Sequence, residues 1–289
     1  MRSITWETDD GYTVHMGDAC PYLFKALTDD LGATAEAVKA PRQAGRTTYY
    51  TTLDVRTINV TGSLVAYGTS TFSAQAAFDR RRSELCQAFA PNRWGYLTYH
   101  TEDGPRRARC RPIATPTFGP RVNNTCTLDI EFITDSPYWE SADLYVQTVG
   151  LRVKRWIFPM HLPMVFGSLT PRAIVNNPTG EMIYPTVEIM STAQLITVTN
   201  ETAGRHISIN RPIMQGQKMI IRMEDASASI WTQDAYGAYQ ETEDVSHWLT
   251  LGSDPWGRVP GDNIITIANE IPEETPTTYL KYRLPYLGV

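Results

Sequence analysis

Histidines and cysteines are the residues of this chain best suited to bind a metal or to act as nucleophiles. They are His15, His100, His161, His206, His247, Cys20, Cys86, Cys110 and Cys126. None of them has a partner at metal-ligand spacing, and the sequence contains no C-x-x-C, H-E-x-x-H or G-x-S-x-G motif. We therefore predict no metal site and no catalytic nucleophile, and we interpret the cysteines as reduced residues of the core or of interfaces.

Two carboxylates, Asp129 and Glu131, stand at alternate positions of the segment CTLDIEFIT (residues 126–134). This alternation predicts a strand with both acids on its outward face, where a solvated or interfacial ion pair is the ordinary interpretation. A fold could still bring distant acids together as the acid pair of a glycosidase. Because the sequence also lacks a glycine-rich phosphate-binding motif, we predict no cofactor and no enzymatic activity.

Arginines form two clusters that could bind phosphates, namely Arg80, Arg81 and Arg82, and Arg107, Arg109 and Arg111. The first cluster lies in a predicted helix, where a solvated face is the favoured interpretation. The second alternates around Cys110, so its side chains share one face of a strand. For this row we favour pairing with Asp129 and Glu131 of an adjacent strand, or with acids of a neighbouring subunit.

Aromatic residues cluster in WTQDAYGAYQETEDVSHW (residues 231–248). Aromatic faces in the loops of a β-sandwich can stack on sugar rings, although packing in the core and loops is the favoured interpretation. A carbohydrate-binding protein that recognises a host surface therefore remains the alternative. The residues concerned are Trp231, Tyr236, Tyr239 and Trp248.

Length and composition indicate two domains, because 289 residues, of which 42% are hydrophobic, can bury two ordinary cores. The formal net charge of −5 does not give the excess of positive charge that is typical of proteins that bind nucleic acid or an anionic membrane. No run approaches the ~20 apolar residues that a membrane-spanning helix needs, and the N-terminus has acids where a signal peptide needs an apolar core. We expect a soluble chain.

One segment of the first half has helical periodicity. In STFSAQAAFDRRRSELCQAF (residues 70–89) the apolar residues fall on one stripe and Pro91 follows it, which predicts an amphipathic helix over about 71–89. Asp103 and Gly104 predict the turn of the hairpin that follows. The first half is therefore expected to be a β domain with one packed helix.

Two features are expected before this helix. The apolar residues up to Val55 and those from Ile58 onward do not fall on the same alternate positions, which predicts a β-bulge between them. Residues 25–50 are expected to form a loop.

The segment SPYW (residues 136–139) ends the strand at 126–134, because Pro137 cannot donate to a ladder. We expect Tyr138 and Trp139 to cover the end of the sheet and close an N-terminal domain of residues 1–150. A ligand-stacking role for the two rings is the alternative.

A connector of residues 151–172 is rich in aromatics and prolines and is predicted to be buried between domains or subunits. Its main residues are Trp156, Phe158, Pro159 and Phe166.

The second half, residues 173–289, consists of short β-prone runs separated by Asn, Gly and Pro. Runs at a spacing of roughly 8 to 12 residues, with no helical window between them, predict an antiparallel β-sandwich of the jelly-roll or lectin kind. The chain as a whole is thus predicted to be mainly β.

The order of these features resembles the distal tail proteins of long-tailed, non-contractile bacteriophages. The resemblance rests on RTINVTGSLVAYG, a helix carrying RRRSEL, a hairpin, DSPYWES, the connector WIFPMHLPMVFGS, and a second half with PTVEI, TNETAG and VPGDN. It spans nearly the whole chain, and the SPYW stop and the aromatic connector carry most of it.

The resemblance implies a structural protein of the virion, located at the distal end of the tail and assembled in the host cytoplasm. Six copies would form a ring through the N-terminal domain, and a galectin-like C-terminal sandwich would project outward. The ring would join the tail tube protein to the tail-tip hub and to receptor-binding proteins, and genomic DNA would pass through its channel without specific binding. A tail lysin or depolymerase is a third hypothesis, which would need an acid pair in a groove.

Overall fold

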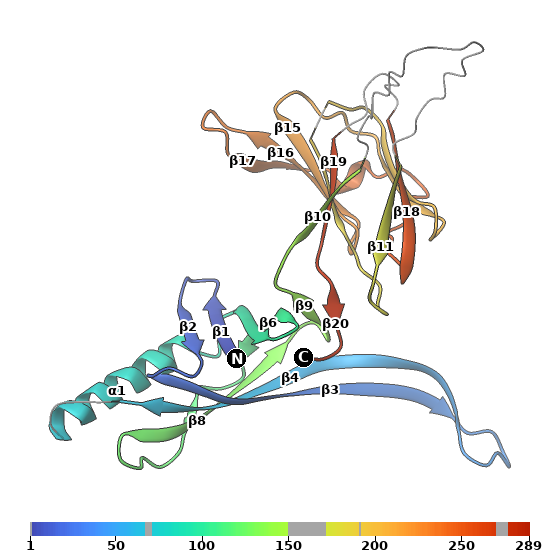
Figure 1. The fold of residues 1–289 in the computed structure, drawn as a ribbon. Helices are drawn as coiled ribbons and strands as arrows, with labels where there is room; N and C mark the ends of the chain where they lie inside the picture. The colour runs from blue at the N-terminus through green and yellow to red at the C-terminus, as the bar shows by residue number, and fades with distance from the viewer. Residues whose placement is uncertain (1, 67–70, 150–171, 191, 270–276) are drawn as a thin grey trace, which may run out of the picture. The chain divides into compact units, whose positions relative to one another are not determined.

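The computed structural model describes residues 2–66, 71–149, 172–190, 192–269 and 277–289. The chain divides into two compact units (Figure 1). Unit 1 comprises residues 1–142 together with the last five residues, Pro285–Val289, and unit 2 comprises Asp143–Leu284. Unit 2 is therefore inserted into the chain of unit 1.

Unit 1 is built on a ten-stranded antiparallel sheet with the main strand order β2-β1-β5-β6-β8-β4-β3. Three short strands extend it, since β9 pairs with β6 and with β20, and β7 pairs with β8. The described residues contain one α-helix, α1, of Thr71–Ala88. The strands are β1 (Ser3–Thr8), β2 (Thr13–Met16), β3 (Tyr22–Val38), β4 (Thr47–Val65), β5 (Gly95–Thr101), β6 (Gly104–Pro112), β7 (Thr117–Phe118), β8 (Thr125–Thr134), β9 (Trp139–Ser141) and β20 (Pro285–Tyr286).

The core of unit 1 follows from alternation in the strands and from the apolar stripe of the helix. Along β8 every second side chain is buried, which leaves Asp129 and Glu131 outside. Helix α1 covers one face of the sheet and buries Phe78 and Leu85 against it. The predicted helix, the predicted hairpin turn at Gly104 and the end of the strand before Pro137 are all confirmed.

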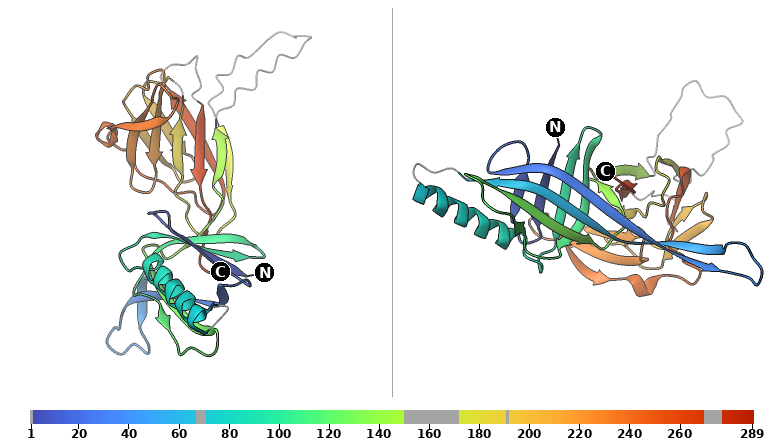
Figure 2. Two further views of the ribbon diagram at one scale, coloured as in Figure 1. Left: turned by 90° about the vertical axis from the view of Figure 1, so that its left-hand side faces the viewer. Right: turned by 90° about the horizontal axis from the view of Figure 1, so that it is seen from below.

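Strands β3 and β4 are much longer than the rest of the sheet, and they run on as a two-stranded ribbon (Figures 1 and 2). Every residue of β4 from Thr47 to Val55 is exposed, and burial begins at Arg56. We call residues 32–55 the ribbon. The expectation of a loop at residues 25–50 is wrong, because most of these residues lie in two paired strands.

The register of β3 and β4 shifts between Leu31 and Ala33, which face Arg56 and Leu53. This bulge lies just before the predicted position between Val55 and Ile58. The alternation of apolar and polar residues is interrupted here because the strand leaves the core. Beyond this point neither face of the strand is buried, so no alternation is required.

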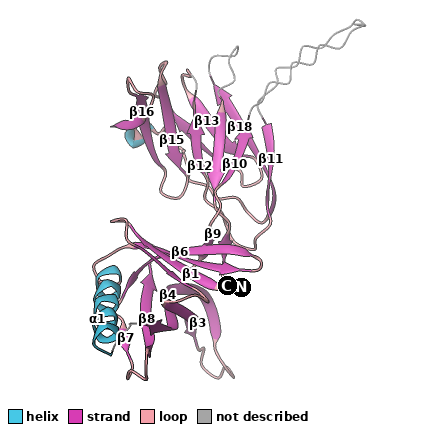
Figure 3. Cartoon of the chain, turned by 60° about the vertical axis from the view of Figure 1, so that its left-hand side comes forward, coloured by secondary structure: helices cyan, strands magenta, loops and turns pink. Residues whose placement is uncertain are grey.

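Unit 2 is a two-sheet antiparallel sandwich, as predicted (Figure 3). One sheet has the order β10-β19-β12-β15-β16-β17 and the other β11-β18-β13-β14. A 3-10 helix, η1 (Ser246–Trp248), follows β17. The strands are β10 (Tyr145–Val149), β11 (Arg172–Asn177), β12 (Thr186–Ile189), β13 (Ile196–Asn200), β14 (Arg205–Ile209), β15 (Gln217–Arg222), β16 (Ser227–Gln233), β17 (Tyr239–Asp244), β18 (Gly261–Asn269) and β19 (Thr278–Tyr282).

The two sheets of unit 2 enclose a core of aliphatic side chains together with Trp256. Asn200 and Asn263 are also buried, and the Asn200 side chain donates to Oδ1 of Asn263 at 3.1 Å. Buried amides are stable in such a position only when they are hydrogen-bonded. They tie the loop at Gly257 and Val259 to β13 and β18.

Limited proteolysis tests the proposed division into domains. Trypsin should cut the native protein first at the tip of the ribbon, where Lys39, Arg42 and Arg46 are exposed. Mass spectrometry of the early fragments identifies the sites. Early cleavage inside residues 174–268 would contradict an independently folded sandwich.

Candidate assembly interfaces

The ribbon is the largest exposed feature of unit 1 that a folded monomer leaves unsupported. Nine consecutive exposed residues of β4 span roughly 30 Å at about 3.3 Å per residue. The ribbon carries large apolar side chains in the open, among them Tyr49 at 69% and Tyr50 at 53% exposure, with Val38, Leu53 and Val55. An isolated two-stranded ribbon is marginally stable in water, and exposed apolar side chains of this size are typical of an interaction surface.

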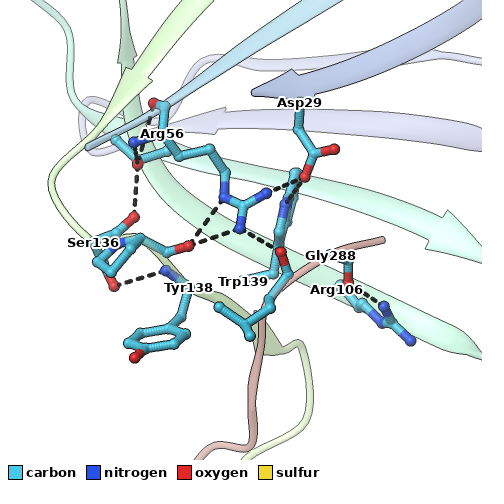
Figure 4. Close-up of polar contacts among 10 residues, drawn as sticks. Asp29, Arg56, Arg106, Ser136, Tyr138, Trp139 and Gly288 are labelled. Atoms are coloured by element: carbon cyan, nitrogen blue, oxygen red, sulfur yellow. Dashed lines mark hydrogen bonds and ion pairs between the residues drawn. The ribbon is translucent and has the colours of Figure 1, made fainter. Parts of the chain in front are cut away.

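The root of the ribbon, in contrast, is held by a buried polar cluster (Figure 4). Arg56 is only 1% exposed, and its guanidinium forms an ion pair with Asp29 of β3. It also donates from Nε and Nη2 to the carbonyl of Pro137, at 3.0 and 2.8 Å. The indole N–H of Trp139 donates to the same Asp29 carboxylate at 3.1 Å. The ribbon therefore leaves unit 1 from a fixed base.

Trp139 lies inside the core of unit 1. Its side chain is fully buried, and it is the first residue of β9. Tyr138 is half-buried. A closing role for these two residues stays a proposal, whereas the four connector residues Trp156, Phe158, Pro159 and Phe166 lie outside the described residues.

The arginine row of β6 lies on one face of its strand, as the alternation predicts. Cys110 is buried and Arg109 is exposed. Arg107 stacks on Tyr96 with 4.2 Å from Cζ to the ring centroid, and Arg111 lies over Trp94 at 5.7 Å. The residues that contribute most of the binding energy in protein interfaces are often arginines and large aromatics that lie side by side.

The predicted pairing of this row with Asp129 and Glu131 is wrong, whereas pairing with acids of a neighbouring subunit stays a prediction. Arg107 is paired with Glu140 at 3.4 Å and Arg109 with Asp9 at 3.1 Å, rather than with Asp129 or Glu131. The reason is register, because β6 pairs with β8 only where Cys110–Pro112 face Phe132–Thr134. Both acids of β8 therefore lie beyond the paired stretch.

Helix α1 carries a second cluster of arginines on its outer side. Arg80 and Arg81 line a cavity of about 220 Å³ with Ala77 and Glu84. Burial and the neighbouring Glu84 carboxylate raise the pKa of Tyr22, whose hydroxyl lies 3.5 Å from that carboxylate. Arg82 instead stacks over Phe118 of β7 at 4.8 Å. The cavity is open to solvent, and its lining contains two guanidinium groups and one carboxylate.

The four aromatics proposed for sugar stacking do not form one platform. Trp231 and Tyr239 lie on neighbouring strands, and the amine of Lys218 lies 5.6 and 4.5 Å from their ring centroids. Tyr236 is in the turn between β16 and β17, and Trp248 is in η1.

Lys218 and Lys281 hold the buried carboxylate of Glu188 beneath this pair. Burial acts to raise the pKa of Glu188, but hydrogen bonds from the two lysines hold it below its usual value.

Within the described residues, no group of three or more His, Cys, Asp or Glu side chains is placed to hold a metal ion. No helix among them is long and apolar enough to cross a membrane. Sequence reasoning missed two residues, Arg56 and Asp29. Their only signal is that each is a charged residue at a position that the alternation of its strand assigns to the apolar face.

No family model and no curated protein sequence matches the chain. Solved structures match it over its whole length. The SPP1 Dit protein (gp 19.1), described as a paradigm of the hub adsorption apparatus in phages that infect Gram-positive bacteria, aligns with a TM-score of 0.68 and 12% identity, and the alignment covers 99% of each chain.

Chains of the phage p2 baseplate in its activated conformation, with Sr and with Ca, align with TM-scores of 0.57 and 0.55. Their identities are 12% and 11%, and each alignment covers 100% of both chains. The resemblance to phage distal tail proteins drawn from the sequence is thus confirmed at the level of the fold, and both units of this chain together have the fold of a phage tail hub protein.

Proposed function

We propose that this protein is a structural adaptor of a phage tail, which forms a ring of six copies at the distal end of the tail tube. The observation that carries the proposal is the ribbon. It exposes nine successive residues of β4 and several large apolar side chains, and such a ribbon gains stability when a neighbouring copy covers it. The likeness to hub proteins over the whole chain supports the same function.

In this proposal the contacts between copies are head-to-tail, so the ribbon of one copy lies on a different surface of the next. A head-to-tail contact that closes on itself gives a ring. The arginine row of β6 and the cavity of α1 are the candidate receiving surfaces, because both offer guanidinium groups beside aromatic or apolar side chains. The ring joins the tube to the tip and to receptor-binding proteins, and it leaves a channel for DNA.

Reversing the charge of the arginine row tests this assignment. We expect the triple substitution Arg107→Glu, Arg109→Glu and Arg111→Glu to weaken ring formation by about tenfold or more, because it removes the guanidinium groups that stack on Tyr96 and Trp94 at the proposed interface. Static light scattering measures the assembly, and circular dichroism measures the fold of the monomer.

The matched control makes the same change of charge at three exposed arginines of unit 2, namely Arg172, Arg205 and Arg222. This control should assemble as the unmodified chain does. Equal assembly of the two variants would remove the arginine row from the interface.

Carbohydrate binding by unit 2 is the second candidate, and the pairing of Trp231 with Tyr239 around Lys218 is the observation that favours it. A glycan array of the full chain tests it. Selective binding that is lost on Trp231→Ala and kept on Tyr236→Ala would support this function, and an array without selective signal would reject it.

A further inference from the structure

The last residues of the chain return to unit 1 and are held there by two arginines. Strand β20 pairs with β9, with Tyr286 opposite Trp139. The guanidinium of Arg106 lies 4.3 Å from the centroid of the Tyr286 ring and donates to the carbonyl of Gly288 (Figure 4). Arg56 donates to the carbonyl of Leu287. We call residues 287–289 the C-terminal tail.

Arg56 is the point at which this tail meets the ribbon. The exposed part of β4 ends at Val55, and Arg56 is the first buried residue after it. One guanidinium thus joins three segments that are distant in sequence, namely Asp29 of β3, the Pro137 carbonyl before β9 and the Leu287 carbonyl. Because a guanidinium is planar and rigid, losing one acceptor loosens the geometry of the other two contacts.

The position of the tail in the sequence, after unit 2, determines when the contact with Arg56 can form. Unit 2 lies between β9 and β20 in the sequence, so the tail becomes available only after all of unit 2 has been synthesised. Until then Arg56 lacks the Leu287 carbonyl as an acceptor. The root of the ribbon is therefore completed by a segment that follows unit 2 in the chain.

We propose that the C-terminal tail fixes the root of the ribbon, so that only chains synthesised beyond unit 2 present a ribbon able to enter the ring. The assembly step rests on the proposed function, whereas the effect on the ribbon concerns the monomer alone. The tail acts through Arg56, which is a positioning residue for the interface rather than part of its surface.

Hydrogen exchange of the monomer tests the first step. Deleting residues 287–289 removes the carbonyls of Leu287 and Gly288, and we expect the amides of residues 28–35 and 52–58 to exchange at least about tenfold faster, as for the loss of a charge-assisted hydrogen bond. Deleting Val289 alone is the matched control, because Gly288 then ends in a carboxylate that still accepts from Arg106. This control should exchange as the intact chain does.

Strands β1 and β5 supply the internal reference, since they share the sheet and pair with neither the ribbon nor β20. Unchanged exchange at residues 28–35 and 52–58 after the deletion would overturn the proposal. An equal rise in β1 and β5 would also overturn it, because the tail would then only stabilise unit 1 as a whole.

The variant Arg56→Lys keeps the charge but loses the planar set of N–H donors of the guanidinium. It should show the same local increase in exchange as the deletion. Light scattering of the truncated chain then tests the second step. A truncated chain that forms rings as readily as the intact chain would overturn the role in assembly, whatever the exchange shows. Faster local exchange in a protein whose intact form makes no ring would instead reject the proposed function and leave the action of the tail on the ribbon in place.

Discussion

Shortening the ribbon is expected to abolish ring assembly while unit 1 stays folded. Thr34 and Thr52 face each other across the ribbon, so residues 35–51 can be replaced by Asn-Gly, which forms a tight two-residue hairpin turn. The removed residues contribute no side chain to the core of unit 1, and the melting temperature should change little. The particle mass measured by light scattering should fall to that of one chain.

A milder pair of substitutions tests whether assembly depends on the exposed side chains of the ribbon or on its length. Tyr49→Ser with Tyr50→Ser keeps the ribbon but removes two large exposed rings, and we expect it to weaken assembly strongly. Tyr236→Ser, at a residue that is 97% exposed in unit 2, is the control and should have no effect. Normal rings from the shortened protein would show that the ribbon is not an interface.

Truncating Trp139 is expected to cause a large loss of stability in unit 1. The side chain is fully buried in the core, and its indole N–H is bound to Asp29 at the root of the ribbon. Replacing a buried aromatic by alanine leaves a cavity, so Trp139→Ala should lower the free energy of unfolding by about 3–5 kcal/mol. Chemical denaturation followed by tryptophan fluorescence and circular dichroism measures this.

Trp139→Phe separates the two contributions, because it keeps most of the volume and loses the hydrogen bond. We expect it to cost less than the alanine variant, at about 1–3 kcal/mol for leaving the Asp29 oxygen with one donor fewer. A midpoint for Trp139→Ala equal to that of the unmodified protein would contradict the burial of this residue.

Strands and helices that face a core could be predicted from the sequence, because burial of one face requires apolar residues at regular intervals along the element. Strand β8 alternates without a fault, and the stripe of α1 includes Phe78 and Leu85, which pack on the sheet. The sandwich of unit 2 was predictable for the same reason, since its strands are short and separated by turn residues.

The ribbon could not be predicted in this way, because both of its faces are exposed and no alternation is required there. Its sequence is also poor in β-forming residues on the β3 side, where Gly32, Ala33, Ala35 and Ala37 occur close together. A strand of this kind is specified by its partner strand, and a pairing between distant segments leaves no local pattern.

The buried cluster at the ribbon's root was hidden for a similar reason. Arg56 is a single charge in RTINV, and its acceptor at Leu287 is 231 residues away. The face of the arginine row could be predicted from alternation, but its partners Glu140 and Asp9 depended on register and could not.

The mass and symmetry of the assembled particle test the central claim most directly. Six chains of 32.5 kDa correspond to about 195 kDa. We predict that electron microscopy of the purified protein at high concentration, alone or mixed with the tail proteins encoded beside it, shows closed rings with six-fold symmetry and this mass. A protein that stays monomeric under both conditions would contradict the adaptor ring.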